Sequence, residues 1–195
     1  MTNFRLQALF AGLICALSLA SSVLATPLLY SRRSGHEFTL INKCNREIQP
    51  IFANTACGYS PRCDGAGHYT GAQPDPIAPG ATATASAPYA FVGRVFDKTS
   101  GECGPSGEGC SIGEFNLDTG SAYTAQAYDL SNIQGFTQGL SIGAAGCDTV
   151  TCSSVNCACD QAYPPGDETG CGADLPVRAC GPGNIAFTMT FCPDE

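Results

Sequence analysis

Cysteine thiols are the side chains here whose number and spacing most clearly indicate a chemistry. Twelve of the thirteen cysteines lie between Cys44 and Cys192. In an exported chain such thiols meet an oxidising compartment and pair, so an even number predicts up to six disulfide bonds and no free thiol. The remaining one, Cys15, lies in a leader that is removed. A zinc site is the alternative, but zinc sites favour histidines or C-x2-C pairs, and the chain has two histidines and no C-x2-C motif.

Other candidate reactive motifs lack the context that their chemistry needs. Ser121 has no nucleophile-elbow context, Gly139-Leu-Ser-Ile-Gly143 matches G-x-S-x-G in its letters only, and the sequence has no phosphate-binding loop or dinucleotide fingerprint. His36 and His68 each follow a glycine, and we expect both on exposed loops. We therefore expect no metal and no cofactor.

Residues 1–25 have the pattern of a signal peptide. One positive charge in Met1–Arg5 precedes a short apolar core, Ala8–Ala20, and small residues precede a cut after Ala25. The core is shorter than the ~20 apolar residues of a membrane span. We therefore expect a secreted, extracellular protein.

The rest of the chain has the length of a single domain. Arg32-Arg33 makes residues 26–33 either a short propeptide or a flexible tail and leaves residues 34–195 as the folded domain. The whole chain carries nine Lys+Arg against 17 Asp+Glu, a net charge of −8. This acidity argues against nucleic acid and anionic membranes as partners and is compatible with neutral or cationic ones. We expect a monomer.

Short strands separated by turns dominate the pattern. Residues 185–191 alternate large apolar residues with Ala and Thr, which is typical of a half-buried strand. Pro50 interrupts another candidate and indicates an edge strand or a bulge. No run of 12 or more residues has a helical stripe, so an all-β sandwich or barrel is predicted. The predicted strands are 38–42, 48–53, 81–85, 90–96, 112–117, 123–130 and 185–191.

The stretch from Gly146 to Cys180 has a different composition. Cysteines crowd there and large apolar residues are few. Such a segment cannot build a core of its own. We expect a loop excursion that disulfide bonds hold in place.

Three segments resemble the thaumatin-like protein family. Phe38–Cys44 ends in Asn-x-Cys, like the family's opening strand. Gly113–Leu117 and Tyr128–Phe136 are similar to its Glu-Phe-x-Leu strand and its Asp-Ile/Val-Ser-x-x-x-Gly-Phe/Tyr signature. Thr188–Pro193 is similar to its Val-Thr-Phe-Cys-Pro ending. The resemblance extends from Phe38 to Pro193.

The resemblance implies a disulfide-rich thaumatin-like β-sandwich. Larger members have a long second domain, which is truncated here to a cysteine-rich loop region at Cys147–Cys180, so the chain is similar to the short, fungal-type members. Alignment with the family pairs Cys44 with Cys192 and Cys147 with Cys180. On the chain-entropy model, closing the longer of these two loops contributes about 5 kcal/mol at most.

The other eight cysteines are assigned less completely. Cys103 with Cys110 is a local pairing, and Cys57 and Cys63 can close a small loop of their own. The remaining four are Cys152, Cys157, Cys159 and Cys171. Four cysteines allow three sets of disulfide pairs, and the sequence leaves all three open.

The resemblance also implies a candidate site. Family members carry an acidic cleft, and some cleave β-1,3-glucans; two core carboxylates of that cleft map onto Glu114 and Asp129. Glycosidic cleavage needs one protonated carboxyl and one carboxylate, so we assign Glu114 as general acid and Asp129 as base or water-positioning group. Without the resemblance, both would be interpreted as ordinary solvated or turn-capping acids.

Asp118 and Arg94 are further binding candidates on the same grounds. Asp118 would replace another cleft aspartate of the family. Arg94 resembles the arginine of an aromatic-x-Arg strand, and we expect it to be an ion-pair partner rather than a catalyst. Phe115 and Tyr128 are expected in the core, because adjacent strand residues point to opposite sides.

Three functions are consistent with this sequence. The interpretation we favour is a secreted thaumatin-like protein that binds β-1,3-glucan of cell walls through an acidic cleft, with weak or no hydrolysis. One alternative is an endo-β-1,3-glucanase that uses Glu114 and Asp129. The other is a non-enzymatic secreted protein with an antifungal, stress-related or host-interaction role. The expected partner is accordingly a neutral glycan or a secreted protein.

Overall fold

The computed structural model describes residues 35–54, 69, 71–118 and 125–194. Within these ranges the regular secondary structure is almost entirely strand, and no helix is long and apolar enough to cross a membrane. An irregular helical turn, Gly170–Asp174, precedes the ninth strand. The strands are β1 His36–Asn42, β2 Pro50–Asn54, β3 Thr82–Ala87, β4 Val92–Asp97, β5 Ile112–Leu117, β6 Gln126–Ser131, β7 Leu140–Ala144, β8 Thr149–Cys152, β9 Arg178–Cys180 and β10 Phe187–Phe191.

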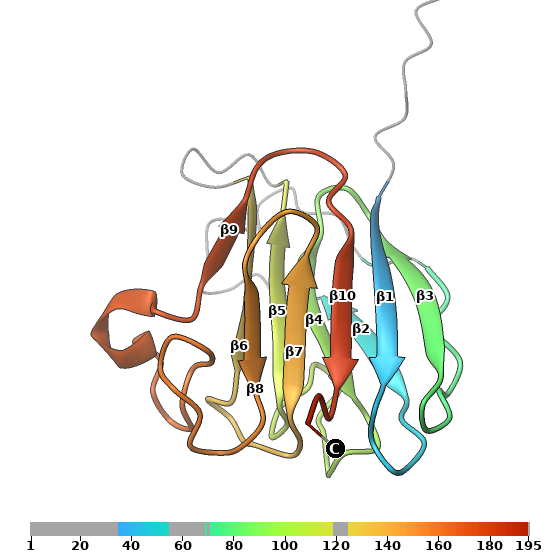
Figure 1. Cartoon of the computed structure of the whole chain (residues 1–195), viewed down its shortest axis with the longest axis horizontal. Helices are drawn as coiled ribbons and strands as arrows, with labels where there is room; N and C mark the ends of the chain where they lie inside the picture. Colours follow the sequence, from blue (N-terminus) through green and yellow to red (C-terminus); the bar gives the residue numbers. More distant parts are fainter. Residues whose placement is uncertain (1–34, 55–68, 70, 119–124, 195) are drawn as a thin grey trace, which may run out of the picture. The chain divides into compact units, whose positions relative to one another are not determined.

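The described strands form two five-stranded sheets (Figure 1). One sheet has the order β3-β1-β10-β7-β8 and the other β2-β4-β5-β6-β9. Neighbouring strands are antiparallel except β1 and β10, which pair in parallel from Phe38 opposite Phe187 to Asn42 opposite Phe191. This confirms the predicted all-β, disulfide-rich sandwich. β2 lies at a sheet edge and begins at Pro50, which agrees with the edge position predicted there.

An aromatic cluster joins the two sheets. The ring of Phe187 on β10 lies 5.2 Å from that of Phe38, 5.4 Å from that of Phe115 and 5.5 Å from that of Tyr128, measured between centroids. Phe38 and Phe187 come from one sheet, and Phe115 and Tyr128 from the other, so the cluster fills the space between the layers. The Tyr128 hydroxyl donates a hydrogen bond to the Asp148 carbonyl. The expectation that Phe115 and Tyr128 belong to the core is confirmed.

The prediction of an exposed His36 is wrong. Its side chain is fully buried at the start of β1, with Nδ1 3.1 Å from the Ile185 carbonyl and Nε2 3.1 Å from the Tyr89 carbonyl. The preceding Gly35 allows this entry into the sheet, because a Cβ there would lie 1.9 Å from the Ala87 carbonyl oxygen. His68 lies outside the described residues.

The excursion between Gly146 and Cys180 is more regular than predicted. It contains β8 and β9, and each adds an edge strand to one sheet. Val150 of β8 and Ala162 are fully buried in the common core, so the excursion is held by core packing as well as by disulfides. β7 was not predicted either, because Gly143 weakens the strand signal.

Five disulfide bonds connect the described cysteines. The pairs predicted from the resemblance and from local spacing, Cys44–Cys192, Cys147–Cys180 and Cys103–Cys110, are all present. Of the three open pairings, the structure has Cys152–Cys157 with Cys159–Cys171. The predicted Cys57–Cys63 loop lies outside the described residues.

Replacing Phe187 by alanine should destabilise the fold by about 3–5 kcal/mol, because it removes the ring that contacts both sheets. Thr188→Ala is the matched control on the same strand, since Thr188 is exposed and its loss should cost under about 0.5 kcal/mol. Denaturant unfolding under non-reducing conditions measures both. Equal destabilisation by the two substitutions would contradict a core centred on Phe187.

The two short disulfides of the excursion can be mapped chemically. Partial reduction with alkylation, followed by peptide mass spectrometry, should recover Cys152 with Cys157 and Cys159 with Cys171. Thiol titration of the denatured, unreduced protein should find none of the ten described cysteines free. A peptide that links Cys152 to Cys159 or to Cys171 would show that the excursion is folded differently.

Candidate functional site

Three adjacent strands of the second sheet bring three charged side chains into line. Arg94 on β4 lies opposite Glu114 on β5, and Glu114 lies opposite Asp129 on β6. Their strand neighbours Val95 and Phe115 point into the core, so the three face the outer side of the sheet. We call Arg94, Glu114 and Asp129 the carboxylate row.

Arg94 and Glu114 form a partly buried ion pair. Arg94 Nε lies 2.9 Å from Glu114 Oε1, and the two side chains are 14% and 25% exposed. The expected ion-pair role of Arg94 is therefore present. A guanidinium keeps its charge at every relevant pH, so Arg94 supplies a permanent positive charge beside Glu114.

Asp129, unlike Glu114, has a buried carboxyl oxygen, Oδ1, with no hydrogen-bond partner among the described residues. Burial, and next the negative charge of Glu114, raise the pKa of Asp129 well above its ordinary value, while Arg94 lowers it and Asp174 raises it further. The row therefore combines an ion-paired carboxylate with a neighbouring carboxyl whose pKa is raised above that of an ordinary aspartate. The chemical roles assigned to Glu114 and Asp129 from the sequence stay a prediction.

Two further residues reach the row from the excursion, and sequence reasoning missed both. Tyr163 forms a parallel bridge with Ser131 at the end of β6, and its hydroxyl donates a 2.8 Å hydrogen bond to Asp174 Oδ1. Burial, this hydrogen bond and the charge of Asp129 raise the pKa of Tyr163 strongly. Asp174 ends the turn that the Cys159–Cys171 bridge holds, so its position could be found only with the disulfide connectivity known.

Asp118 is not part of the carboxylate row. Strand alternation would put it on the same side as Glu114, but its backbone φ is +48°, which breaks the alternation. Its side chain is 2% exposed, and Oδ2 lies 3.3 Å from His36 Nε2. Of the four predicted site residues, the structure thus brings together Arg94, Glu114 and Asp129 and separates Asp118. No cluster of His, Cys, Asp or Glu suited to a metal ion occurs in the described part of the chain.

Replacing Asp129 by asparagine should stabilise the protein at neutral pH. The folded-state pKa of Asp129 is raised, so between the unfolded and folded values the folded chain binds more protons and stability falls as pH rises. Asparagine keeps the size of the side chain without its ionisation. The gain should disappear below the ordinary aspartate pKa of about 3.9, where the Asp129 carboxyl is neutral in both the folded and the unfolded chain.

Urea unfolding across this pH range measures the effect. Asp75→Asn, an exposed aspartate on a loop, is the matched control and should change stability little at any pH. If Asp129→Asn were no more stable than the parent at neutral pH, Asp129 would not be a desolvated acid.

Comparisons with known proteins bear on the fold alone. No protein-family model matches the chain, and no curated protein matches it. Among solved structures, the thaumatin-like xylanase inhibitor TLXI aligns with a TM-score of 0.50 and 14% identity, over 80% of this chain and 99% of that one. The protein elicitor MoHrip2 from Magnaporthe oryzae aligns with a TM-score of 0.47 and 18% identity, over 80% and 98%. With its two sheets, its disulfides and this likeness, the chain has the thaumatin-like fold.

Proposed function

We propose that the protein is secreted and binds β-1,3-glucan of cell walls at the carboxylate row, with weak or no hydrolysis. The observation that carries the proposal is the direct cross-strand pairing of Glu114 with Asp129, beside Arg94, on the outer face of a sheet. The leader pattern and the disulfide-rich fold support export, since such bonds persist in oxidising compartments.

The row offers the groups that a neutral glycan needs. Glu114 is 25% exposed, so its carboxylate can accept hydrogen bonds from sugar hydroxyls, while the Arg94 guanidinium carries several donors. Charge-assisted hydrogen bonds of this kind are stronger than neutral ones. A chain with a net charge of −8 repels anionic polymers but not a neutral glucan.

Hydrolysis by the same residues is the second candidate, and the raised pKa of Asp129 favours it. Directly paired strand residues have Cβ atoms about 4.5–5.5 Å apart, so both carboxyls can approach one glycosidic bond. A carboxyl separation of about 5–5.5 Å would make the enzyme a retaining one. Asp129 would protonate the leaving oxygen while the Glu114 carboxylate bonds to the anomeric carbon. Water would then release the sugar, giving its proton to Asp129 and freeing the Glu114 carboxylate.

The ion pair with Arg94 favours a binding role for Glu114 over a role as nucleophile. A carboxylate oxygen that accepts a 2.9 Å hydrogen bond from a guanidinium is stabilised in its ground state and is a weaker nucleophile. Attack on the sugar would have to use the other oxygen of Glu114. The row is thus better suited to holding a glucan than to cleaving it.

A pull-down on insoluble β-1,3-glucan, with reducing-sugar release measured on the same sample, tests the proposal. The parent protein should be retained with little or no release. Glu114→Gln and Asp129→Asn should weaken retention, and Asp75→Asn, which removes an exposed carboxylate outside the row, should not. All variants should keep the parent's far-UV circular dichroism spectrum.

Other results of this experiment would indicate other functions. Sugar release that falls about 10²–10⁴-fold in Asp129→Asn would make Asp129 the general acid of a glucanase. Neither retention nor release by the parent would overturn the glucan proposal. It would leave a non-enzymatic secreted protein with a protein partner, as the name of the xylanase inhibitor describes for that neighbour.

A further inference from the structure

The sheet opposite the carboxylate row has a regular array of threonines on its outer face. Pairing aligns ten outward residues of its five strands in two rows across the sheet, and Glu37 opposite Ser86 lies in the next row. Seven of these ten positions are Thr and one is Ser. The first row is Thr84, Thr39, Thr188, Gly143 and Thr149, and the second is Thr82, Ile41, Thr190, Ser141 and Thr151. We call these ten positions the threonine face.

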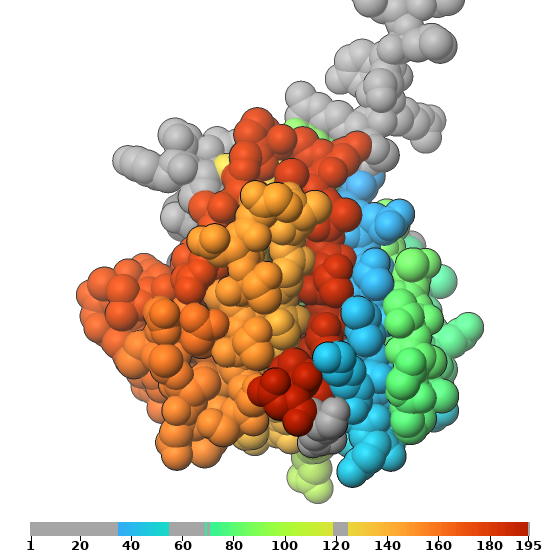
Figure 2. Space-filling view, in the orientation of Figure 1, coloured from blue at the N-terminus to red at the C-terminus, as the bar shows by residue number. Residues whose placement is uncertain are grey.

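The geometry of a sheet gives this face a two-dimensional repeat. Adjacent strands lie about 4.8 Å apart, and alternate residues along a strand are about 6.6 Å apart. Threonine is β-branched and restricted in χ1, so its hydroxyl and methyl groups are held in few orientations. The strands that carry the face lie side by side in Figures 1 and 2, from β3 across β1, β10 and β7 to β8. Hydroxyls and methyls therefore recur at fixed intervals across five strands.

The hydroxyls of the face are available to a ligand. Ser141 and Thr151 bond to each other at 2.8 Å. Within the described part of the chain, the hydroxyls of Thr39, Thr82, Thr84, Thr188 and Thr190 make no hydrogen bond to protein. These groups can bond only to water or to a ligand that replaces it.

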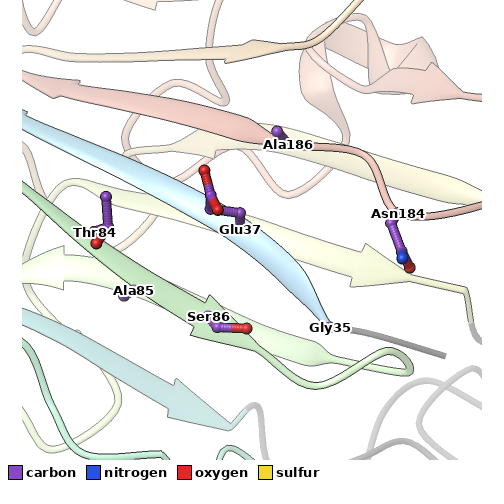
Figure 3. A pocket seen from close by; sticks show the side chains of 7 residues that line it. All are labelled: Gly35, Glu37, Thr84, Ala85, Ser86, Asn184 and Ala186. Atoms are coloured by element: carbon purple, nitrogen blue, oxygen red, sulfur yellow. The ribbon is translucent and has the colours of Figure 1, made fainter. Parts of the chain in front are cut away.

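The face carries no charge, although the chain as a whole is strongly acidic. None of its ten residues is ionisable. Two acids border it: Glu37, the next outward residue of β1, lies beside Ser86 and Thr84 (Figure 3), and exposed Asp148 directly precedes Thr149. None of the ten is aromatic. This composition favours a small, neutral and repeating hydrogen-bonding ligand.

We infer that the threonine face binds the surface of crystalline water, that is, ice. Ice presents water oxygens in rows whose repeat is comparable with that of paired strands, and each oxygen both donates and accepts hydrogen bonds, as a threonine hydroxyl does. At Gly143 the row has no side chain, and a hollow lined by Thr39, Thr149 and Thr188 lies there. This hollow can hold a water molecule that continues the array.

Adsorption to ice is measurable without any other ligand. The purified, disulfide-intact protein should show thermal hysteresis, inhibit ice recrystallisation, and be retained on a growing ice surface when fluorescently labelled. Thr188→Tyr puts a bulky ring in the middle of the face and should abolish all three effects. Thr84→Lys on edge strand β3 is a second variant that leaves the central strands intact.

Lys98→Tyr is the matched control, because Lys98 is exposed beyond the end of β4 in the other sheet. It should keep the parent's ice activity, and Thr188→Tyr should keep the parent's β-1,3-glucan retention, since the two faces are separate. Thermal unfolding confirms that each variant is folded. A parent protein without thermal hysteresis and without retention on ice overturns the inference. Retention on crystalline cellulose or chitin that Thr188→Tyr abolishes, with ice activity absent, would overturn it in favour of a polysaccharide site.

Discussion

The parallel pairing of β1 with β10 is the constraint on which the rest of the structure depends. It joins the beginning and the end of the described domain in the middle of one sheet, and Cys44–Cys192 fixes it covalently across a sequence separation of 148 residues. A parallel pair of distant strands has a high cost in chain entropy, which the disulfide reduces. Phe187 on the same strand then contacts the other sheet, so one strand aligns both layers.

The two outer faces of the sandwich follow from this alignment but have opposite chemistry. On the second sheet, cross-strand pairing concentrates charge, and its cost shows in the raised pKa of Asp129. On the first sheet, the same kind of pairing aligns uncharged hydroxyls. One architecture thus carries an electrostatic surface and a neutral, repetitive one without either disturbing the core between them.

Alternation and the resemblance predicted much of this structure. Residues 112–117 form a strand with the predicted bounds, and Phe115 faces the core as period two requires. The inward turn of Asp118 could not be predicted, because it depends on one backbone dihedral angle. Asp174 and Tyr163 were missed because tertiary bridges, not local pattern, bring them to β6. The threonine face needed the register of five strands, which no single segment contains.

The disulfides of the excursion divide the molecule into parts that can change independently. Cys152–Cys157 and Cys159–Cys171 close only short loops inside the excursion, while Cys147–Cys180 joins its two ends. Exposed residues inside the two short loops can therefore vary in evolution without altering how the sheets pair. Because Asp174 and Tyr163 come from this segment, mutation there can retune what the carboxylate row recognises while the sandwich stays as it is.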